Sequence, residues 1–214
     1  MAYKHLSLLA FPISLLISTV LCQTPIPKKP LGFVFNNGKS SAPVHLEIYA
    51  DLTCPDCQQA WPTIKQVAEV YGPDKVRVVF QSFPLPYHTN SFVAAQSVAV
   101  AEGVNATLVF PWIDVLFKNQ NQLYNFQTMD KNRFDINNIV ASLAPKADIS
   151  QSAMKDGLSE ASYEGQARLS WKHGCSKTVA STPSFFINDV IVNEADASWT
   201  LDQWKKLIDS LLQK

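Results

Sequence analysis

The sequence predicts an α/β protein in which a block of helices interrupts a sheet. Segments 44–50 and 75–81 alternate apolar and polar residues, are rich in β-forming side chains and are separated by a helical apolar period. Residues 89–175 then show helical periods and no convincing strand. A strand-like pair at 182–187 and 190–192 follows, before an amphipathic final helix. The order therefore predicts a strand–helix–strand unit, a helical insertion, a hairpin and a closing helix.

A cysteine pair, Cys54-Pro55-Asp56-Cys57, heads the first predicted helix directly after the first strand. The apolar residues of this helix recur at three and four positions until Gly72-Pro73 ends it. A strand, helix and strand in succession form a right-handed crossover with parallel strands, whose carboxyl ends lie at one edge of the sheet. The cysteines and the loop 84–88 after the second strand are therefore expected at the same edge.

Helices fill the remainder of the predicted chain. We interpret the apolar cluster of Phe110, Trp112 and Phe117 as core or subdomain packing. Asn188-Asp189 predicts the two-residue turn of the hairpin. The expected helices span 91–102, 108–120, 136–143, 150–157, 161–173 and 201–212.

The N-terminal residues predict a secretory route. Residues 1–22 have a short cationic start and an apolar run at 6–21, which is typical of a cleaved signal peptide, with an uncleaved anchor as the alternative. Residues 23–42 are rich in Pro, Asn, Gly and Ser and predict a surface leader. Residues 43–214 then form one domain, with the helical insertion at about 89–175. The expected location is secreted or lumenal.

Composition excludes several classes of partner. The 214 residues carry 18 basic and 18 acidic side chains, which disfavours nucleic acid or, after signal cleavage, a membrane as the partner. No cofactor or metal is expected.

Signal cleavage leaves Cys54, Cys57 and Cys175. Pairing of the first two leaves Cys175 single, and we expect it buried and inert, with a partner-accessible thiol as the alternative.

The place of Cys54 at a helix N-terminus predicts redox chemistry. A free cysteine with a pKa of about 8.5 is mostly protonated at pH 7, whereas aligned backbone N–H groups that lower it to about 6.5 make it mostly thiolate. Cys54 is then the nucleophile, and Cys57, one helical turn later, resolves the mixed disulfide. The alternatives are a structural bridge and a zinc site, for which only Cys175, His173 and His88 offer further ligands.

From residue 43 to 212 the order of motifs resembles the thioredoxin fold in its DsbA-like form, which carries a helical subdomain between the two halves of the sheet. The chain also resembles the secreted thioredoxin-like proteins of plants. The motifs that carry the resemblance are Cys54-Pro55-Asp56-Cys57, Pro84-Leu85-Pro86-Tyr87-His88, Phe117-Lys118-Asn119-Gln120 and the run 179–188.

The resemblance implies a substrate site opposite the cysteines. In this family a cis peptide bond precedes the proline that corresponds to Pro183, and the Thr182–Pro183 backbone pairs with an extended substrate segment. The resemblance also implies disulfide- or thiol-containing protein substrates, and a redox partner or glutathione for recycling. His88 lies at this edge by topology and is expected to contact a thiolate or substrate. Alternatively, it only precedes a helix capped by a neighbouring residue.

Acidic residues near the cysteines predict a mild redox couple. Asp56, inside the Cys-Pro-Asp-Cys motif, and Asp51 should raise the pKa of the Cys54 thiol, unless solvent screens them. Thioredoxins carry a buried acid six positions before the first cysteine, where this chain has Ile48, so water is the expected proton acceptor. We therefore expect a less oxidising couple than that of DsbA-type proteins with histidine in the dipeptide.

These observations favour a thiol–disulfide oxidoreductase. The competing hypothesis is a non-catalytic thioredoxin-like binding module in which Cys54 and Cys57 form a structural bridge. One further motif, Asn105-Ala106-Thr107, predicts N-glycosylation of Asn105 along a secretory route.

Overall fold

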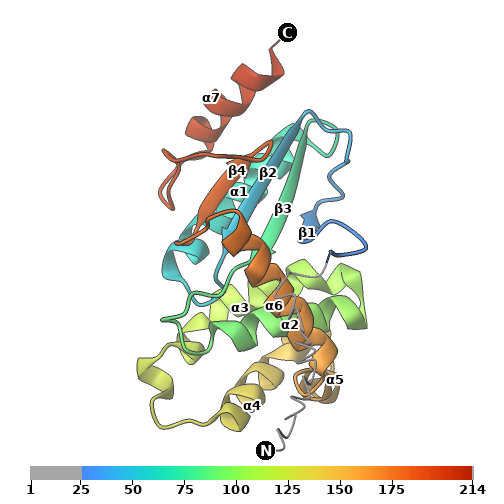
Figure 1. Ribbon diagram of the computed structural model, residues 1–214, viewed down its shortest axis with the longest axis vertical. Helices are drawn as coiled ribbons and strands as arrows, with labels where there is room; N and C mark the ends of the chain where they lie inside the picture. Colours follow the sequence, from blue (N-terminus) through green and yellow to red (C-terminus); the bar gives the residue numbers. More distant parts are fainter. Residues whose placement is uncertain (1–25, 214) are drawn as a thin grey trace, which may run out of the picture.

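The computed structural model describes residues 26–213, so the signal peptide expected at 1–22 lies outside the described residues. A five-stranded mixed sheet forms one half of the molecule and a block of helices forms the other (Figure 1). Between residues 26 and 213, no helix combines the length and apolar character needed to cross a bilayer.

The sheet is built around two parallel strands. β2 (Val44–Ala50) pairs with β3 (Val76–Ser82) in parallel, so both strands end at the same edge. β4 (Ser184–Ile187) runs antiparallel to β2 and begins at that edge, and β5 (Val190–Ile191) follows it as a hairpin. The predicted α/β class with an inserted helical block is confirmed.

The turn of this hairpin follows from its two residues. Asn188 and Asp189 both have positive φ angles, 48° and 68°, in the left-handed region that asparagine and aspartate tolerate best after glycine. The Asn188 side chain also accepts a hydrogen bond from the backbone N–H of His45. The predicted two-residue turn is confirmed.

One strand was not expected. β1 (Phe33–Phe35), within the predicted surface leader, pairs antiparallel with β3 and makes the other edge of the sheet. The Phe35 ring packs edge-on against Trp61 and Phe110 at centroid distances of 5.4 and 4.9 Å. The leader prediction was therefore wrong for this part. Three residues are too few to show a periodicity, and the strand forms because β3 offers it an open edge.

Helices cover both faces of the sheet (Figure 1). α1 (Pro55–Tyr71) and α7 (Leu201–Leu212) lie on the face that carries Ile48, and α6 (Ala161–Ser176) crosses the opposite face. The remaining helices form the block with α6: α2 (Ser91–Val104), α3 (Val109–Asn119), α4 (Arg133–Leu143) and α5 (Gln151–Gly157).

The observed helices differ from the expected ones at their ends. α4 starts three residues before its expected first residue, Ile136, because Asn132 caps it and forms a capping box with Asp135. The expected packing role of the aromatic cluster is confirmed, since Trp112 is fully buried and Phe117 is buried in the core.

The end of α6 exposes Cys175. A Cβ atom on Gly174 would lie 2.3 Å from the Phe83 ring, so only glycine permits this close approach to the sheet. The residue after this glycine points away from the contact, and Cys175 is exposed to solvent. The expectation of a buried Cys175 was wrong, because the helix turns its glycine rather than its cysteine toward the core.

Candidate active site

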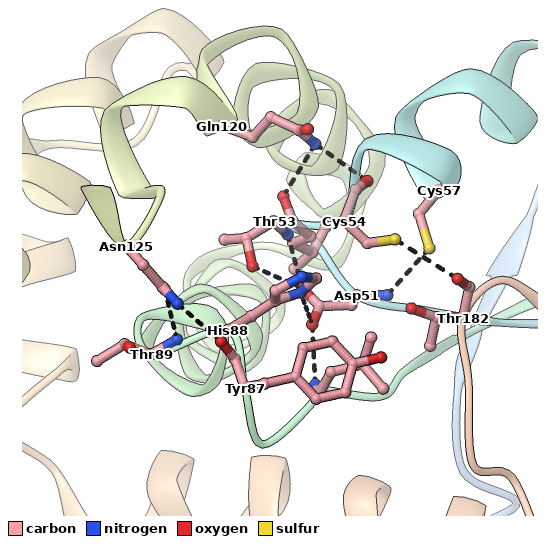
Figure 2. A network of polar contacts seen from close by, with 12 residues as sticks. Asp51, Thr53, Cys54, Cys57, Tyr87, His88, Thr89, Gln120, Asn125 and Thr182 are labelled. Carbon is pink, nitrogen blue, oxygen red and sulfur yellow. Dashed lines mark hydrogen bonds and ion pairs between the residues drawn. The ribbon is translucent and has the colours of Figure 1, made fainter. Parts of the chain in front are cut away.

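Both cysteines lie at the start of α1, shortly after the end of β2. Cys54 is the N-cap residue of α1 and Pro55 is its first residue, a position that suits proline because its missing N–H has no helical acceptor there. Cys54 is 5% exposed and Cys57 is fully buried, and both are free thiols. Figure 2 shows the two sulfur atoms side by side, with the Thr182 backbone facing them.

The two thiols have opposite pKa shifts. A hydrogen bond from the Cys57 thiol, helped by the backbone N–H groups of Cys57 and Asp56, outweighs burial and lowers the pKa of Cys54 to about 6. Burial and the neighbouring Cys54 raise the pKa of Cys57 well above its ordinary value. At pH 7, Cys54 is therefore mostly thiolate while Cys57 stays protonated.

The acidic residue between the cysteines does not act as expected. Asp56 is exposed to solvent, and its backbone N–H is among the groups that lower the pKa of Cys54. Solvent screening leaves its carboxylate charge little effect on the buried sulfur. The expected rise of the Cys54 pKa through Asp56 was therefore wrong.

The loop before β4 faces the reactive sulfur. The Thr182–Pro183 peptide bond is cis, as the family resemblance implied. The Cys54 thiol group lies 3.5 Å from the carbonyl oxygen of Thr182. The Thr182 hydroxyl is buried without a hydrogen-bond partner among the described residues. The expected nucleophile and the expected substrate loop are thus in contact.

Asp51 is the buried acid of this site. Its side chain is fully buried, and Oδ1 accepts hydrogen bonds from the Thr53 N–H (2.7 Å) and hydroxyl (2.8 Å). Its backbone N–H donates to the sulfur of Cys57 at 3.4 Å. Sequence reasoning considered Asp51 only as a nearby charge and looked for a buried acid at Ile48. The folded chain instead buries an acid three positions before Cys54.

His88 pairs with this acid. The Nδ1–H group of His88 donates to Asp51 Oδ2 at 2.9 Å, and the Leu85 N–H donates to the same oxygen at 2.8 Å. His88 therefore lies at the active edge, but within residues 26–213 its ring makes no hydrogen bond to Cys54 or Cys57. Asn90 is the N-cap residue of α2, and its side-chain amide donates to Leu123 O and Thr128 Oγ1. The alternative that His88 precedes a helix capped by a neighbouring residue is therefore met in the position of Asn90, although the Asn90 side chain makes no capping hydrogen bond.

The helical block supplies two residues that sequence reasoning did not assign. The Gln120 amide donates to the carbonyl oxygens of Leu52 and Cys54, both at 3.4 Å, and the Tyr124 hydroxyl donates to Gln120 Oε1. Burial, followed by the negative charge of Cys54, raises the pKa of Tyr124. Gln120 belongs to a motif of the family resemblance, whereas no signal pointed to Tyr124.

A cavity of about 250 Å³ opens beside the cysteine turn. Thr53 and Pro55, the two neighbours of Cys54, form one wall, and His88 and Tyr124 belong to the others. Asn125 ties the lining together, because its side chain accepts from the Thr89 N–H and donates to Tyr87 O (Figure 2). The complete lining is Thr53, Pro55, His88, Leu123, Tyr124 and Asn125.

The other singled-out residues lie elsewhere. His173 Nδ1 lies 3.2 Å from the Tyr49 hydroxyl on the α6 face of the sheet. Within residues 26–213, no group of three or more His, Cys, Asp or Glu side chains is arranged to hold a metal ion. Asn105 is exposed after α2, where its side chain accepts hydrogen bonds from the Thr107 N–H and hydroxyl. Its glycosylation stays a prediction.

Solved structures share this fold. BdbD from Bacillus subtilis superposes with a TM-score of 0.69 at 19% identity, covering 86% of this chain and 94% of that one. The thiol-disulfide exchange protein alpha-DsbA2 from Wolbachia pipientis gives 0.65 at 17% identity, covering 84% and 87%. A periplasmic thioredoxin-like protein from Salmonella enterica gives 0.56 at 19% identity, covering 82% and 87%.

A curated relative matches by sequence. The Na(+)/H(+) antiporter NhaA 3 from Salinispora tropica is 26% identical over 152 residues, which cover 71% of this chain. The chain spans only 21% of the length of that relative. The family model described as thioredoxin matches residues 34–210, nearly all of the described chain. With a thioredoxin sheet, a DsbA-like helical block and this match, the chain belongs to the thioredoxin family.

Proposed function

We propose that this protein is a thiol–disulfide oxidoreductase with Cys54 as nucleophile and Cys57 as resolving thiol. The observation that carries the proposal is the split between the two thiols. The pKa of Cys54 is lowered to about 6, and that of the neighbouring, fully buried Cys57 is raised. This split places one reactive thiolate beside one protected thiol, as two-step disulfide exchange requires.

The geometry supports the following sequence of steps. The Cys54 thiolate attacks one sulfur of a substrate disulfide, forms a mixed disulfide and expels the other substrate sulfur as a thiolate. Cys57 then loses its proton to water, attacks the Cys54 sulfur and expels the second substrate thiolate. The N–H of Asp51 stabilises the Cys57 thiolate as it forms. The pair ends as a disulfide and the substrate as two thiols, and the reverse sequence oxidises a dithiol.

The proposed substrates are proteins that carry disulfides or thiols, bound through the Thr182–Pro183 backbone. The names of structural relatives support this choice, since one is a thiol-disulfide exchange protein and another is a periplasmic thioredoxin-like protein. We propose a secretory location, secreted or lumenal, and recycling by a redox partner or glutathione. Kinship with the secreted thioredoxin-like proteins of plants belongs to the same proposal.

Trapping tests the assigned roles. In a Cys57→Ser variant mixed with insulin under limiting reductant, a disulfide between Cys54 and insulin should persist, because no second thiol resolves it. Mass spectrometry of the alkylated mixture detects the adduct. Wild-type protein, which resolves the adduct, is the matched control. The absence of an adduct in the variant would contradict the assigned roles.

The redox potential separates this function from the binding module. Thioredoxin, with a cysteine pKa of about 7, has a potential of about −270 mV, and DsbA, with a pKa of about 3.5, has about −120 mV. Because a Cys54 pKa of about 6 lies between the values of those two proteins, we expect a potential between about −270 and −120 mV. Equilibration with glutathione buffers measures it. A potential below about −300 mV without turnover would select a structural bridge instead.

A further inference from the structure

His88 stands between a buried carboxylate and the cavity beside the reactive turn. Its side chain is 23% exposed, whereas that of Asp51 is fully buried. We propose that His88 is a catalytic residue that gives a proton to the sulfur leaving the substrate disulfide, and that Asp51 is its positioning residue. The cavity lined by His88 and Tyr124 would receive the leaving half of the substrate. This inference rests on the proposed function and names a residue that the two-cysteine scheme does not use.

Asp51 decides which ring nitrogen is free. Its carboxylate accepts four hydrogen bonds, two from Thr53, one from the Leu85 N–H and one from His88. Because a carboxylate only accepts, the His88 Nδ1 carries hydrogen. The bond to Asp51 is the only hydrogen bond that the ring makes to residues 26–213. Nε2 therefore remains to exchange a proton with a ligand, which is the arrangement of a base oriented by a third group.

The cavity lies beside the turn that carries the reactive sulfur. The neighbours of Cys54 on both sides, Thr53 and Pro55, form part of its wall. The Tyr124 hydroxyl, which belongs to the same lining, lies close enough for the charge of Cys54 to act on it. At about 250 Å³ the cavity is smaller than the roughly 300–1,000 Å³ of sites that enclose a whole small molecule. It fits one side-chain-sized group, such as the departing half of a disulfide.

The proposed step balances in atoms and charge. The Cys54 thiolate forms a bond to one substrate sulfur, and the substrate S–S bond breaks with its electron pair on the other sulfur. That sulfur takes the proton from Nε2 of the His88 imidazolium and leaves as a neutral thiol. His88 remains neutral with its Nδ1–H on Asp51, and water returns the proton before the next turnover. In the reverse direction, His88 removes the proton from an attacking substrate thiol.

Tyr87 and Arg168 are further titratable groups near the His88 ring. The Tyr87 ring packs edge-on against the imidazole at a centroid distance of 5.0 Å. Arg168 shares a second cavity with His88 and pairs with Glu164. Arg168 is largely exposed and neutralised by this partner, so the buried Asp51 carboxylate is the group bonded directly to the ring.

The expected effect depends on the leaving group. Exchange is faster when the leaving thiol has a lower pKa, and the attacking thiol has a Brønsted coefficient of about 0.5. With the same magnitude for the leaving thiol, a donor that lowers its effective pKa by about two units accelerates exchange about tenfold. An aromatic thiol leaves readily without help because it is a stronger acid than an alkyl thiol. Hence the residue should matter for dialkyl disulfides and little for aromatic ones.

His88→Asn tests the proposal. Its amide nitrogen matches the position of Nδ1 and keeps a donor for Asp51, but nothing replaces Nε2. The reduced protein reacts in single turnover with hydroxyethyl disulfide and with dithiodipyridine, and the readout is the ratio of the two rate constants. We expect the ratio of dialkyl to aromatic rate to fall about tenfold. Asp51→Asn should lower the same ratio, because it withdraws the partner that orients the ring.

The controls separate a chemical from a structural role. His45→Asn, at the far end of β2 from the cysteines, should keep the wild-type ratio. If the His88 variant slows both substrates equally, or neither, the proposal is wrong, since a displaced Cys54 affects both reactions alike. Thermal unfolding of each variant verifies that the fold is intact. Turnover by wild type but not by Cys54→Ser tests the proposed function separately, and an inactive wild type would overturn both.

Discussion

Cys54 lies at the N-terminal end of one helix and Cys175 at the C-terminal end of another. The more buried thiol, Cys54, has the lower pKa. Cys54 caps the N-terminus of α1, is nearly buried, and has its pKa lowered to about 6. Cys175 lies in the last turn of α6, is exposed, and has its pKa raised by partial burial of its sulfur. A helix N-terminus presents N–H donors that favour a thiolate, while a C-terminus presents carbonyl groups that do not. Donors, rather than accessibility, make a thiol reactive in this protein.

The largest expected effect is the difference in insulin reduction between Cys54→Ser and Cys175→Ser. Cys54→Ser removes the nucleophile, and insulin reduction should fall by at least about a thousandfold. Cys175→Ser removes an exposed thiol without a proposed role and should leave turnover within about twofold. The turbidity of precipitating insulin measures both. A large loss in the Cys175 variant would break the comparison.

Alkylation at varied pH should separate the two thiols. Only the thiolate reacts, so the rate at Cys54 should fall about tenfold per pH unit below 6 and level off above 7. The rate at Cys175 should still be rising at pH 9, because its pKa is raised above the ordinary value. Mass spectrometry of digested, iodoacetamide-treated protein reports each site. Coincident profiles would show that the helix ends do not differ as described.

Two glycines of α6 test why Cys175 is exposed. A Cβ atom at Gly174 would lie 2.3 Å from Phe83, whereas one at Gly165 would meet nothing within 4 Å. Gly174→Ala should therefore destabilise the protein by about 1–3 kcal/mol. Gly165→Ala, the matched control, should stabilise it by up to about 1 kcal/mol through helix propensity. Urea unfolding measures both, and equal effects would contradict the close approach of α6 to the sheet.

The smallest effect is expected at Asp56. Because its side chain is exposed, replacement by asparagine should shift the pKa of Cys54 by less than about half a unit. The ultraviolet absorbance of the thiolate, titrated in wild type and variant, measures this shift. If the pKa of Cys54 dropped by a full unit, the Asp56 carboxylate would raise that pKa after all.

The sequence predicted the elements that repeat a pattern over many residues. β2 spans the expected segment 44–50 and α7 spans 201–212, because strand alternation and an amphipathic stripe are local signals. β1 escaped prediction, since three residues carry no period and its pairing partner is distant in the chain. The cysteine pair and the Thr182–Pro183 loop were found through their motifs.

The partners of Asp51 needed the folded chain. The Asp51 carboxylate accepts hydrogen bonds from residues 53, 85 and 88. Gln120 and Tyr124 reach the cysteine turn from the helical block. Sequence order alone showed an acid three residues before Cys54 and a histidine in a later loop, but not that they touch.

Local chain chemistry, then, determined every strand except β1, most helices, the reactive cysteine pair and the edge of the sheet at which it lies. Tertiary packing decided which acid is buried, which cysteine is exposed and how far the nucleophile is buried. The physical reason is that a pKa and a hydrogen-bond partner depend on burial and on distances through space. Residues far apart in the chain set both, whereas helix and strand periods are written in neighbouring residues.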